Sequence, residues 1–472
     1  MDLKKFYING QFVEPASFEL FDIINPATEE SIGKVALGSP EDVDIAVSAA
    51  KNAFKKTALL SKQERLDLLE TIRENYKKRY NDIAAAIRTE MGAPVKLAEA
   101  GQTATGLGHL KTAIQVLAGH EFEYEHGDYI IREEPIGVCG LITPWNWPIN
   151  QIVSKMAPAF AAGCTVVLKP SEIAPLSAMI IAEIIHESGL PAGMFNLING
   201  SGPVVGEAMS AHNDIDMMSF TGSTRGGIAV ASASAKSVKR VSQELGGKSP
   251  NIILDDDDFE ASISKGVIHV MSNSGQSCNA PTRMLVPKDR HDEALEIAKT
   301  ITTDIVVGDP INMTSDLGPL VNEVQYQKVQ NLINTGVNEG AQLVIGGTGK
   351  PDGLSKGFYV KPTVFGHVNN EMTIAREEIF GPVLSIISYN SLEEAIVIAN
   401  DTDYGLAAYV TGKDTDKALQ LARGLRAGQV SINYGSSGPA APFGGFKQSG
   451  NGREKAEWGL GEFLEVKAIM GK

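Results

Sequence analysis

Cys278 is the residue best suited to nucleophilic chemistry. It lies in the polar, glycine-containing stretch 273–280, whereas Cys139 and Cys164 lie within or beside apolar runs. Cysteines in apolar strands usually pack as small hydrophobic side chains, so we expect those two to be structural. A thiol reacts as its thiolate, and Cys278 therefore needs partners that the polar loop alone does not supply. The cysteines form no CxxC pair and no Cys/His cluster, so neither a disulfide framework nor a metal site is expected.

Two polar side chains could assist this thiol. Glu244 precedes the glycine turn Gly246-Gly247, where the backbone leaves room for a ligand; an ordinary surface glutamate is the alternative. Asn146 is flanked by two tryptophans and two prolines in the loop 144–148, directly after an apolar run. The prolines restrict this loop, which is either a rigid packed corner or a ligand site that presents an amide.

A glycine-rich segment, residues 220–227, joins an extended apolar run to a predicted helix. Gly222 and Ser223 stand where backbone N–H groups can face an anion such as a dinucleotide pyrophosphate. Thr224 occupies the place of the middle glycine of GxGxxG, so the usual fingerprint fails and a different pyrophosphate geometry is implied. A tight turn with a good helix N-cap is the alternative.

A second nucleotide signal comes one strand–helix unit earlier. Lys169, Ser171 and Glu172 follow a short apolar strand, at the position from which strand ends reach a ribose. A carboxylate accepts hydrogen bonds from ribose hydroxyls but repels a 2'-phosphate, so Glu172 favours NAD over NADP. A simple helix N-cap at Ser171 or Glu172 is the alternative.

The elements that must position these residues alternate between strand and helix from residue 136 onward. Short apolar strands separated by helices are typical of a parallel, doubly wound sheet. The strands are predicted at 137–142, 165–168, 195–198 and 215–220, and the helices at 149–162, 177–188, 204–210 and 225–235. A second alternation over 258–430, with strands at 283–286, 342–345 and 383–387, predicts a second α/β domain. Residues 6–13 are predicted to form short strands that begin a sheet, and residues 121–134 are predicted to form an exposed β-ribbon.

Composition narrows the class of protein. The chain has 472 residues and 43% hydrophobic residues, enough for large cores, and its formal net charge is -15. This charge argues against nucleic acid or an anionic membrane as the main partner. No signal-like apolar segment begins the chain, and no run approaches the roughly 20 apolar residues of a membrane span. We therefore expect a cytoplasmic protein.

Taken together, the motifs resemble the NAD(P)-dependent aldehyde dehydrogenase superfamily from about Phe6 almost to the C-terminus. Seven motifs occur in order: 144–148, 169–172, 220–224, 244–248, 275–278, 377–383 and 442–447, the last continuing family-like to Glu454. The resemblance implies an aldehyde dehydrogenase-like α/β fold with two doubly wound parallel-sheet domains and a small oligomerisation arm. It places an NAD-binding, Rossmann-like domain at 1–118 and 136–246, a catalytic domain at 247–445, and the arm at 119–135 and 446–472.

The resemblance also implies roles for the catalytic residues. Cys278 would attack the aldehyde, and the Asn146 amide with the Cys278 backbone N–H would stabilise the oxyanion. After hydride transfer to NAD, Glu244 would activate the water that hydrolyses the thioester, and Lys155 would belong to a proton path.

Binding residues follow in the same way. The implied cofactor contacts are Thr143, Pro144, Trp145, Lys169, Ser171, Glu172, Gly222, Ser223, Gly227, Leu245, Glu378 and Phe380. The implied substrate contacts are Trp147, Gln151, Ser277, Asn279 and Phe443, with Asn150, Ser154, Ser272 and Tyr434 in the wider channel. The ribbon and the C-terminal tail resemble the family's oligomerisation arm, so a homodimer or homotetramer is expected.

Most of these channel residues are polar or small. Burying an aliphatic tail against them would leave amides and hydroxyls unpaired, so a short or polar aldehyde is expected as substrate rather than a long-chain one. Three alternatives remain. The first is a CoA-acylating dehydrogenase, which typically lacks a base such as Glu244. The second is a binding protein on the same scaffold, which would not need Cys278, Glu244 and Asn146. The third is a cysteine hydrolase, which would need a histidine partner for the thiol.

Overall fold

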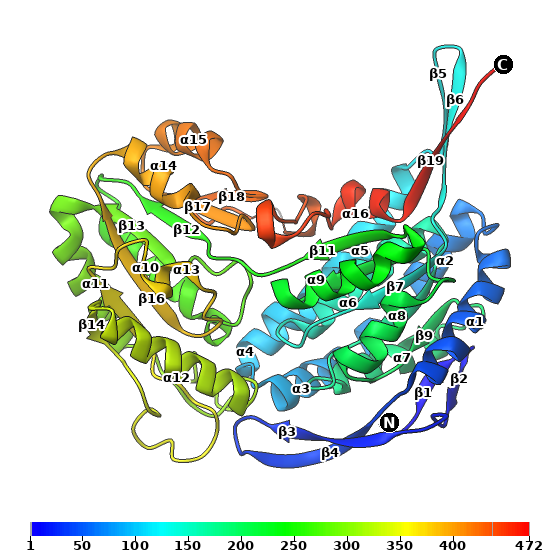
Figure 1. Ribbon diagram of the computed structural model, residues 1–472, viewed down its shortest axis with the longest axis horizontal. Helices are drawn as coiled ribbons and strands as arrows, with labels where there is room; N and C mark the ends of the chain where they lie inside the picture. Colours follow the sequence, from blue (N-terminus) through cyan, green and yellow to red (C-terminus); the bar gives the residue numbers. More distant parts are fainter. Residues whose placement is uncertain (1, 437, 472) are drawn as a thin grey trace.

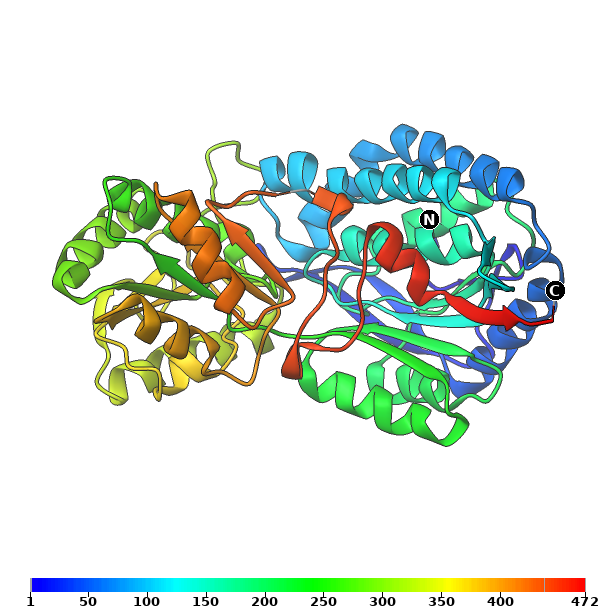
Figure 2. The same ribbon diagram turned by 90° about the horizontal axis from the view of Figure 1, so that it is seen from above.

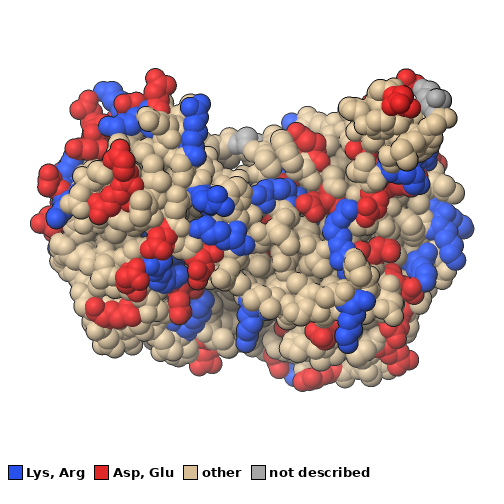
Figure 3. Space-filling model, turned by 45° about the horizontal axis from the view of Figure 1, so that its top comes forward, with Lys and Arg blue, Asp and Glu red and all other residues tan. Residues whose placement is uncertain are grey.

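The computed structural model describes residues 2–436 and 438–471 and shows two α/β domains side by side, with a narrow arm projecting from one of them (Figures 1 and 2). The chain crosses between the domains after strand β11, which leads directly toward β12 (Figure 1). No helix in the described part is both long and apolar enough to cross a membrane. Acidic and basic side chains are mixed over the face seen in Figure 3.

The first sheet has seven strands in the order β11-β10-β7-β8-β9-β1-β2. Five of them are parallel, whereas β1 pairs antiparallel with both β9 and β2. The strands are β1 (Phe6–Ile8), β2 (Gln11–Val13), β7 (Val138–Ile142), β8 (Thr165–Lys169), β9 (Phe195–Leu197), β10 (Met217–Thr221) and β11 (Arg240–Glu244). Residues 6–13, predicted as a small sheet entry, thus extend the edge of this large sheet.

Helices cover both faces of the first sheet. Alternation along β8 shows why: Val166 and Leu168 pack into one core, with α2, α5, α6 and α7, while Val167 packs into the other, with α1. The helices are α1 (Pro40–Thr57), α2 (Lys62–Lys78), α3 (Tyr80–Met91), α4 (Val95–Leu97), α5 (Ala104–Gly119), α6 (Pro148–Ala162), α7 (Leu176–Glu187), α8 (Glu207–Ala211) and α9 (Thr224–Ser234). Cys139 and Cys164 are buried in the first of these cores.

The second sheet also has seven strands, in the order β14-β15-β16-β13-β12-β17-β18. All neighbours are parallel except β14, which pairs antiparallel with β15 at the sheet edge. The strands are β12 (Pro250–Ile253), β13 (Arg283–Pro287), β14 (Gln342–Ile345), β15 (Thr363–Gly366), β16 (Val383–Tyr389), β17 (Ala407–Thr411) and β18 (Gln429–Ile432). The predicted strand 342–345 therefore exists, but it runs against its neighbour.

Helices again lie on both faces of this sheet. On β13, Met284 and Val286 join a core with α10 and α11, and Leu285 joins a core on the opposite face with α14 and α15. The helices are α10 (Phe259–Met271), α11 (His291–Thr303), α12 (Glu323–Asn338), α13 (Thr373–Arg376), α14 (Leu392–Asn400) and α15 (Thr415–Gly424).

Two small sheets complete the fold. The arm consists of β5 (Glu123–His126), β6 (Tyr129–Pro135) and β19 (Leu464–Ile469), in the order β19-β6-β5. A separate hairpin is formed by β3 (Glu19–Asn25) and β4 (Glu30–Leu37). Helix α16 (Ala456–Glu462) packs on α5 and α6, so only the last strand of the segment 446–472 enters the arm.

Candidate functional site

The connection between the two domains is built around Glu244 and two glycines. Glu244 ends β11, and residues 245–249 lead into β12. A Cβ on Gly247 would lie 2.5 Å from the carbonyl oxygen of Cys278, and one on Gly246 would lie 2.4 Å from Glu378 Oε2. Because glycine has no Cβ, the cysteine loop and Glu378 can lie this close to the connection, and a larger residue at either position would collide with them.

Cys278 follows a tight turn between α10 and β13. Three consecutive residues, Asn273, Ser274 and Gly275, have φ of 56°, 55° and 72°, which is the left-handed region. A Cβ on Gly275 would lie 2.0 Å from the carbonyl oxygen of Gly381, so only glycine fits there. This strained turn orients the loop that carries the thiol.

Asn146 is anchored to the same turn. Its Nδ2 donates to the carbonyl of Gln276 at 2.9 Å, and its own carbonyl accepts from Asn273 Nδ2 at 3.1 Å and Gln102 Nε2 at 3.2 Å. An amide nitrogen carries two hydrogens, so one N–H of Asn146 remains for a ligand.

A cavity of about 760 Å³ opens beside Cys278. Its lining includes all five predicted substrate contacts, namely Trp147, Gln151, Ser277, Asn279 and Phe443, together with Asn150 and Tyr434. Trp147 Nε1 donates to Ser277 Oγ at 2.9 Å and so ties the indole to the cysteine loop. Two residues expected in the wider channel lie elsewhere: Ser272 is exposed, and the Ser154 hydroxyl donates to Glu454 Oε2 at 3.3 Å.

Four further side chains that the sequence did not single out also line the cavity: His109, His269, Tyr409 and Lys455. His109 comes from α5, where its Nε2 lies 2.8 Å from Asn150 Oδ1, and burial lowers its pKa to about 4. His269 on α10 stacks on Tyr434 with ring centroids 5.1 Å apart. Neither helix carries a motif at these positions, so only the tertiary structure brings them to the thiol. In the described part of the chain, no histidine hydrogen bonds to Cys278.

The surroundings of the cavity disfavour the charged forms of both reactive groups. Burial, reinforced by the nearby carboxyl groups of Glu378 and Glu244, raises the pKa of Cys278 to about 12. Burial and the neighbouring Glu454 raise the pKa of Glu244 well above its usual value. Both carboxyl oxygens of Glu244 are buried without a hydrogen-bond partner among the described residues. Such unpaired oxygens are costly and point to a missing ligand or water.

Lys155 lies on α6 and forms a buried ion pair with Glu454. Their side chains are 1% and 9% exposed. Both charges act on the pKa of Glu244, which Glu454 raises and Lys155 lowers. The sequence marks Glu454 only as the last residue of the final family-like segment and predicts no role for it. Its contact with Lys155 makes it a second member of the predicted proton path.

Most predicted cofactor contacts lie at the carboxyl ends of the first sheet's parallel strands. Thr143, Pro144 and Trp145 follow β7, Lys169 ends β8 with Ser171 and Glu172 just beyond, and Gly222 and Ser223 follow β10. The chain runs from β7 to β8 and β9 on one side and then starts β10 on the other side of β7. The crevice between β7 and β10 is therefore the topological switch point, where ligands bind in open α/β sheets.

Two predicted contacts come from the second domain. Glu378 Oε1 accepts the N–H of Gly247 at 3.0 Å, next to Leu245 and the glycine turn. Phe380, with φ of 60°, packs edge-on against Trp145 with ring centroids 5.4 Å apart. These contacts bring predicted cofactor residues of the two domains together.

These residues fit a dinucleotide. Ser223 caps α9 by accepting the N–H of Gly226 at 3.2 Å, and a Cβ on Gly227 would collide with Leu245, so glycine keeps the start of α9 close to Leu245. The hydroxyls of Thr143 and Thr221 are buried without partners in the described part of the chain. Lys169 Nζ lies 3.2 Å from Glu172 Oε2 and steadies the carboxylate predicted to meet the ribose.

Comparisons with known proteins agree with this geometry. The model of the Aldehyde dehydrogenase family matches residues 12–469. The 3-succinoylsemialdehyde-pyridine dehydrogenase of a Pseudomonas species is 53% identical over 471 residues, which span 100% of this chain and 99% of that protein. A mutant aldehyde dehydrogenase C from Pseudomonas syringae, solved with NAD+ and octanal, is 52% identical with a TM-score of 0.98, covering 99% of this chain and 96% of that one. The betaine aldehyde dehydrogenase of Staphylococcus aureus, solved with NAD+, is 34% identical with a TM-score of 0.95, covering 99% and 94%. The chain belongs to the aldehyde dehydrogenase family.

Proposed function

We propose that this protein oxidises an aldehyde to the carboxylic acid with NAD, through a covalent bond to Cys278. The observation that carries the proposal is the closeness of three groups: the Asn146 amide is hydrogen-bonded to the turn that carries Cys278, and the glycine connection that begins at the buried Glu244 packs against the Cys278 backbone. Bound NAD would supply the hydride acceptor. The relatives solved with NAD+ support this choice of cofactor.

The chain's own residues divide the work. The proton of the Cys278 thiol passes to the Glu244 carboxylate and on to the solvent, while the sulfur adds to the aldehyde carbon and the carbonyl oxygen becomes an oxyanion. The free N–H of Asn146 and the backbone N–H of Cys278 stabilise that oxygen. Once the hydride has left, an acyl group remains on the sulfur as a thioester.

Glu244 then serves as the base for water. Its oxygens have no hydrogen-bond partner in the described part of the chain, so a water molecule can bind them directly. The carboxylate takes a proton as the water oxygen attacks the thioester carbon, and the thiol and acid are released. The Lys155–Glu454 pair would pass protons between this site and the solvent.

The first experiment follows the absorbance of the reduced cofactor with a panel of aldehydes, each with NAD or NADP and with or without CoA. Native protein is expected to turn over with NAD alone, and Cys278→Ala is expected to be inactive. Glu244→Gln should release about one equivalent of reduced cofactor per site and then nearly stop, because the thioester is no longer hydrolysed. Dependence on CoA, or no turnover with any aldehyde, would overturn the proposal.

Lys455 supports the expectation of a short or polar substrate. Its ammonium lies 4.5 Å from the centre of the Phe443 ring at the cavity wall. In the described part of the chain it has no hydrogen bond or ion pair, and its partly buried position lowers its pKa. A cation without an acceptor inside a binding cavity favours a ligand that brings one. We therefore extend the proposal to aldehydes that carry a carboxylate or a keto group.

Matched substrates test this extension. Succinic semialdehyde should give a lower KM than pentanal in the native enzyme, and Lys455→Met should raise the KM for the semialdehyde about tenfold while leaving pentanal nearly unchanged. Octanal belongs in the series because aldehyde dehydrogenase C was solved with it. Preference for octanal, with no selective effect of Lys455→Met, would refute the substrate class while leaving the dehydrogenase proposal intact.

The arm also bears on the predicted oligomeric state of the protein. The residues of β5 are all exposed, those of β6 are mostly half-buried, and β19 is exposed beyond Leu464. An exposed edge of this kind suits pairing with a second copy, so a homodimer or homotetramer is proposed, in the cytoplasm. Sedimentation of the native chain against one lacking residues 464–472 would test the role of the arm.

A further inference from the structure

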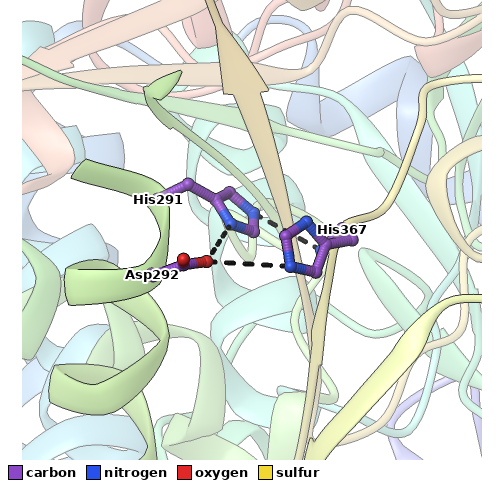
Figure 4. A group of neighbouring side chains, drawn as sticks. All are labelled: His291, Asp292 and His367. Atoms are coloured by element: carbon purple, nitrogen blue, oxygen red, sulfur yellow. Dashed lines mark hydrogen bonds and ion pairs between the residues drawn. The ribbon is translucent and has the colours of Figure 1, made fainter. Parts of the chain in front are cut away.

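We propose that His291, Asp292 and His367 form a binding site for a divalent transition-metal ion such as Zn²⁺, separate from the Cys278 cavity. His291 and Asp292 begin α11, and His367 directly follows β15. Figure 4 shows the two imidazoles and the carboxylate turned toward one another. None of the three residues lines the cavity of Cys278.

The spacing of the donor atoms is close to that of a metal site. Asp292 Oδ1 lies 3.7 Å from His291 Nδ1 and 3.7 Å from His367 Nε2, and one donor atom of each residue lies within 4.8 Å of the others. Zinc bonds to histidine nitrogen and carboxylate oxygen are about 2.0–2.2 Å, which separates tetrahedral ligands by about 3.3–3.6 Å. A small inward movement of the side chains would therefore complete the coordination.

His291 supplies the preformed part of the site. The residue is only 4% exposed, and its Nδ1 is buried without a hydrogen-bond partner among the described residues. Buried polar atoms without partners are rare, and this one faces the carboxylate of Asp292 (Figure 4). A metal ion would give this nitrogen the partner that the protein does not.

The other ring nitrogen of His291 is held by the backbone. It lies 3.4 Å from the N–H of His367, a long contact, and the ring also hydrogen bonds to the backbone of Ile386. Metal-ligating histidines commonly bond the protein through their second nitrogen, which fixes the ring while the first nitrogen coordinates. Coordination through Nδ1 requires the ring proton to sit on Nε2, which then no longer accepts the N–H of His367.

Asp292 and His367 are free to close on an ion. Their side chains are 90% and 58% exposed. Within the described residues, their only ion pairs are those of this group, so closing breaks no contact with a lysine or arginine. The backbone of His367 is left-handed, with φ of 49°, and this conformation brings its ring within 4.5 Å of the His291 ring.

The donor set indicates the class of metal. Two imidazole nitrogens and one carboxylate oxygen suit zinc, cobalt, nickel or copper, whereas magnesium and calcium prefer oxygen ligands. Three protein ligands leave a coordination position for water or a small anion.

Binding of Co²⁺ and Zn²⁺ tests the site directly. Titrations use the Cys278→Ala chain, because its cavity no longer offers a thiol as a competing ligand. Calorimetry and the visible absorption of Co²⁺ should show one ion per chain, and Zn²⁺ should raise the Tm of the protein. Asp292→Asn and His367→Gln, both at exposed side chains, should each weaken binding at least tenfold.

A matched control comes from another histidine–carboxylate pair. His212 Nε2 lies 3.2 Å from Asp44 Oδ1, but no third metal-ligating side chain in the described chain completes that pair. His212→Gln should leave the affinity and the stoichiometry unchanged. Equal binding by the Asp292→Asn/His367→Gln chain, or no saturable binding by the parent, would overturn the proposal.

Discussion

Lys155 and Glu454 form a buried ion pair although 299 residues separate them in the chain. The pair joins α6 of the first domain to the segment that returns from the second domain. It lies beside Glu244, whose pKa is raised by Glu454 and lowered by Lys155. This one contact therefore links the two segments of the chain and also changes the pKa of the proposed base.

Lys155→Met is expected to destabilise the protein by about 3–5 kcal/mol, because it leaves a buried carboxylate without its cation. The double variant Lys155→Met/Glu454→Gln should recover much of that loss. Urea unfolding of both variants, followed by fluorescence, measures the difference. Equal destabilisation of the single and double variants would show that the ion pair itself is not responsible.

Asn146→Ala is expected to lower kcat about 100- to 1000-fold, the usual cost of removing one oxyanion donor. KM for NAD and the alkylation rate of Cys278 should change little, because the amide acts on the developing charge. Gln102→Met is the matched control: it removes a support of the same loop but keeps the amide. A kcat within threefold of native for Asn146→Ala would rule out this role.

The rate of Cys278 alkylation should rise steeply with pH. Its pKa of about 12 means that the thiolate fraction of the cofactor-free enzyme grows about tenfold per pH unit over roughly pH 7 to 9. Inactivation by iodoacetamide, measured across that range, reports the fraction. Glu378→Gln removes the carboxyl group with the largest effect after burial, so its curve should shift to lower pH. A plateau near pH 7 in the native enzyme would contradict the buried, neutral thiol.

Glu172→Gln should relax the preference for NAD. Removing the carboxylate removes the repulsion of a 2'-phosphate, so KM for NADP is expected to fall about tenfold and KM for NAD to rise. Steady-state kinetics with both cofactors measure the change, and Glu183→Gln on α7, which removes a carboxylate paired with Arg79, is the control for the loss of one charge. Unchanged discrimination would place the ribose away from Glu172.

Much of the fold could be predicted from the sequence, because strands buried on both faces appear as short apolar runs. β7, β8, β13 and β16 are all of this kind. Strand direction at the sheet edges could not be predicted in the same way. The hairpin of β1 and β2 has a local signal in its Asn9-Gly10 turn, but the antiparallel pairing of β1 with β9 joins residues far apart in the chain, and β14 carries no local mark of its direction.

The candidate site likewise contains residues that local motifs predict and residues that only packing brings together. Cys278, Glu244 and Asn146 lie in linear motifs, and the resemblance of these motifs to the family predicts a nucleophile, a base and an oxyanion donor. His109, His269 and Lys455 reach the cavity only through packing of α5, α10 and the segment before α16. His291 and His367 likewise meet only because α11 begins beside the end of β15.

By itself, the sequence determined the family and the two parallel-sheet domains and predicted the central reactive groups, because these depend on local residue types and on hydrophobic periodicity. The tertiary structure alone decided the raised pKa values of Cys278 and Glu244, the Lys155–Glu454 contact and the position of Lys455 in the cavity wall. These properties depend on burial and on distances between residues far apart in the chain, and neither quantity is encoded in any single segment.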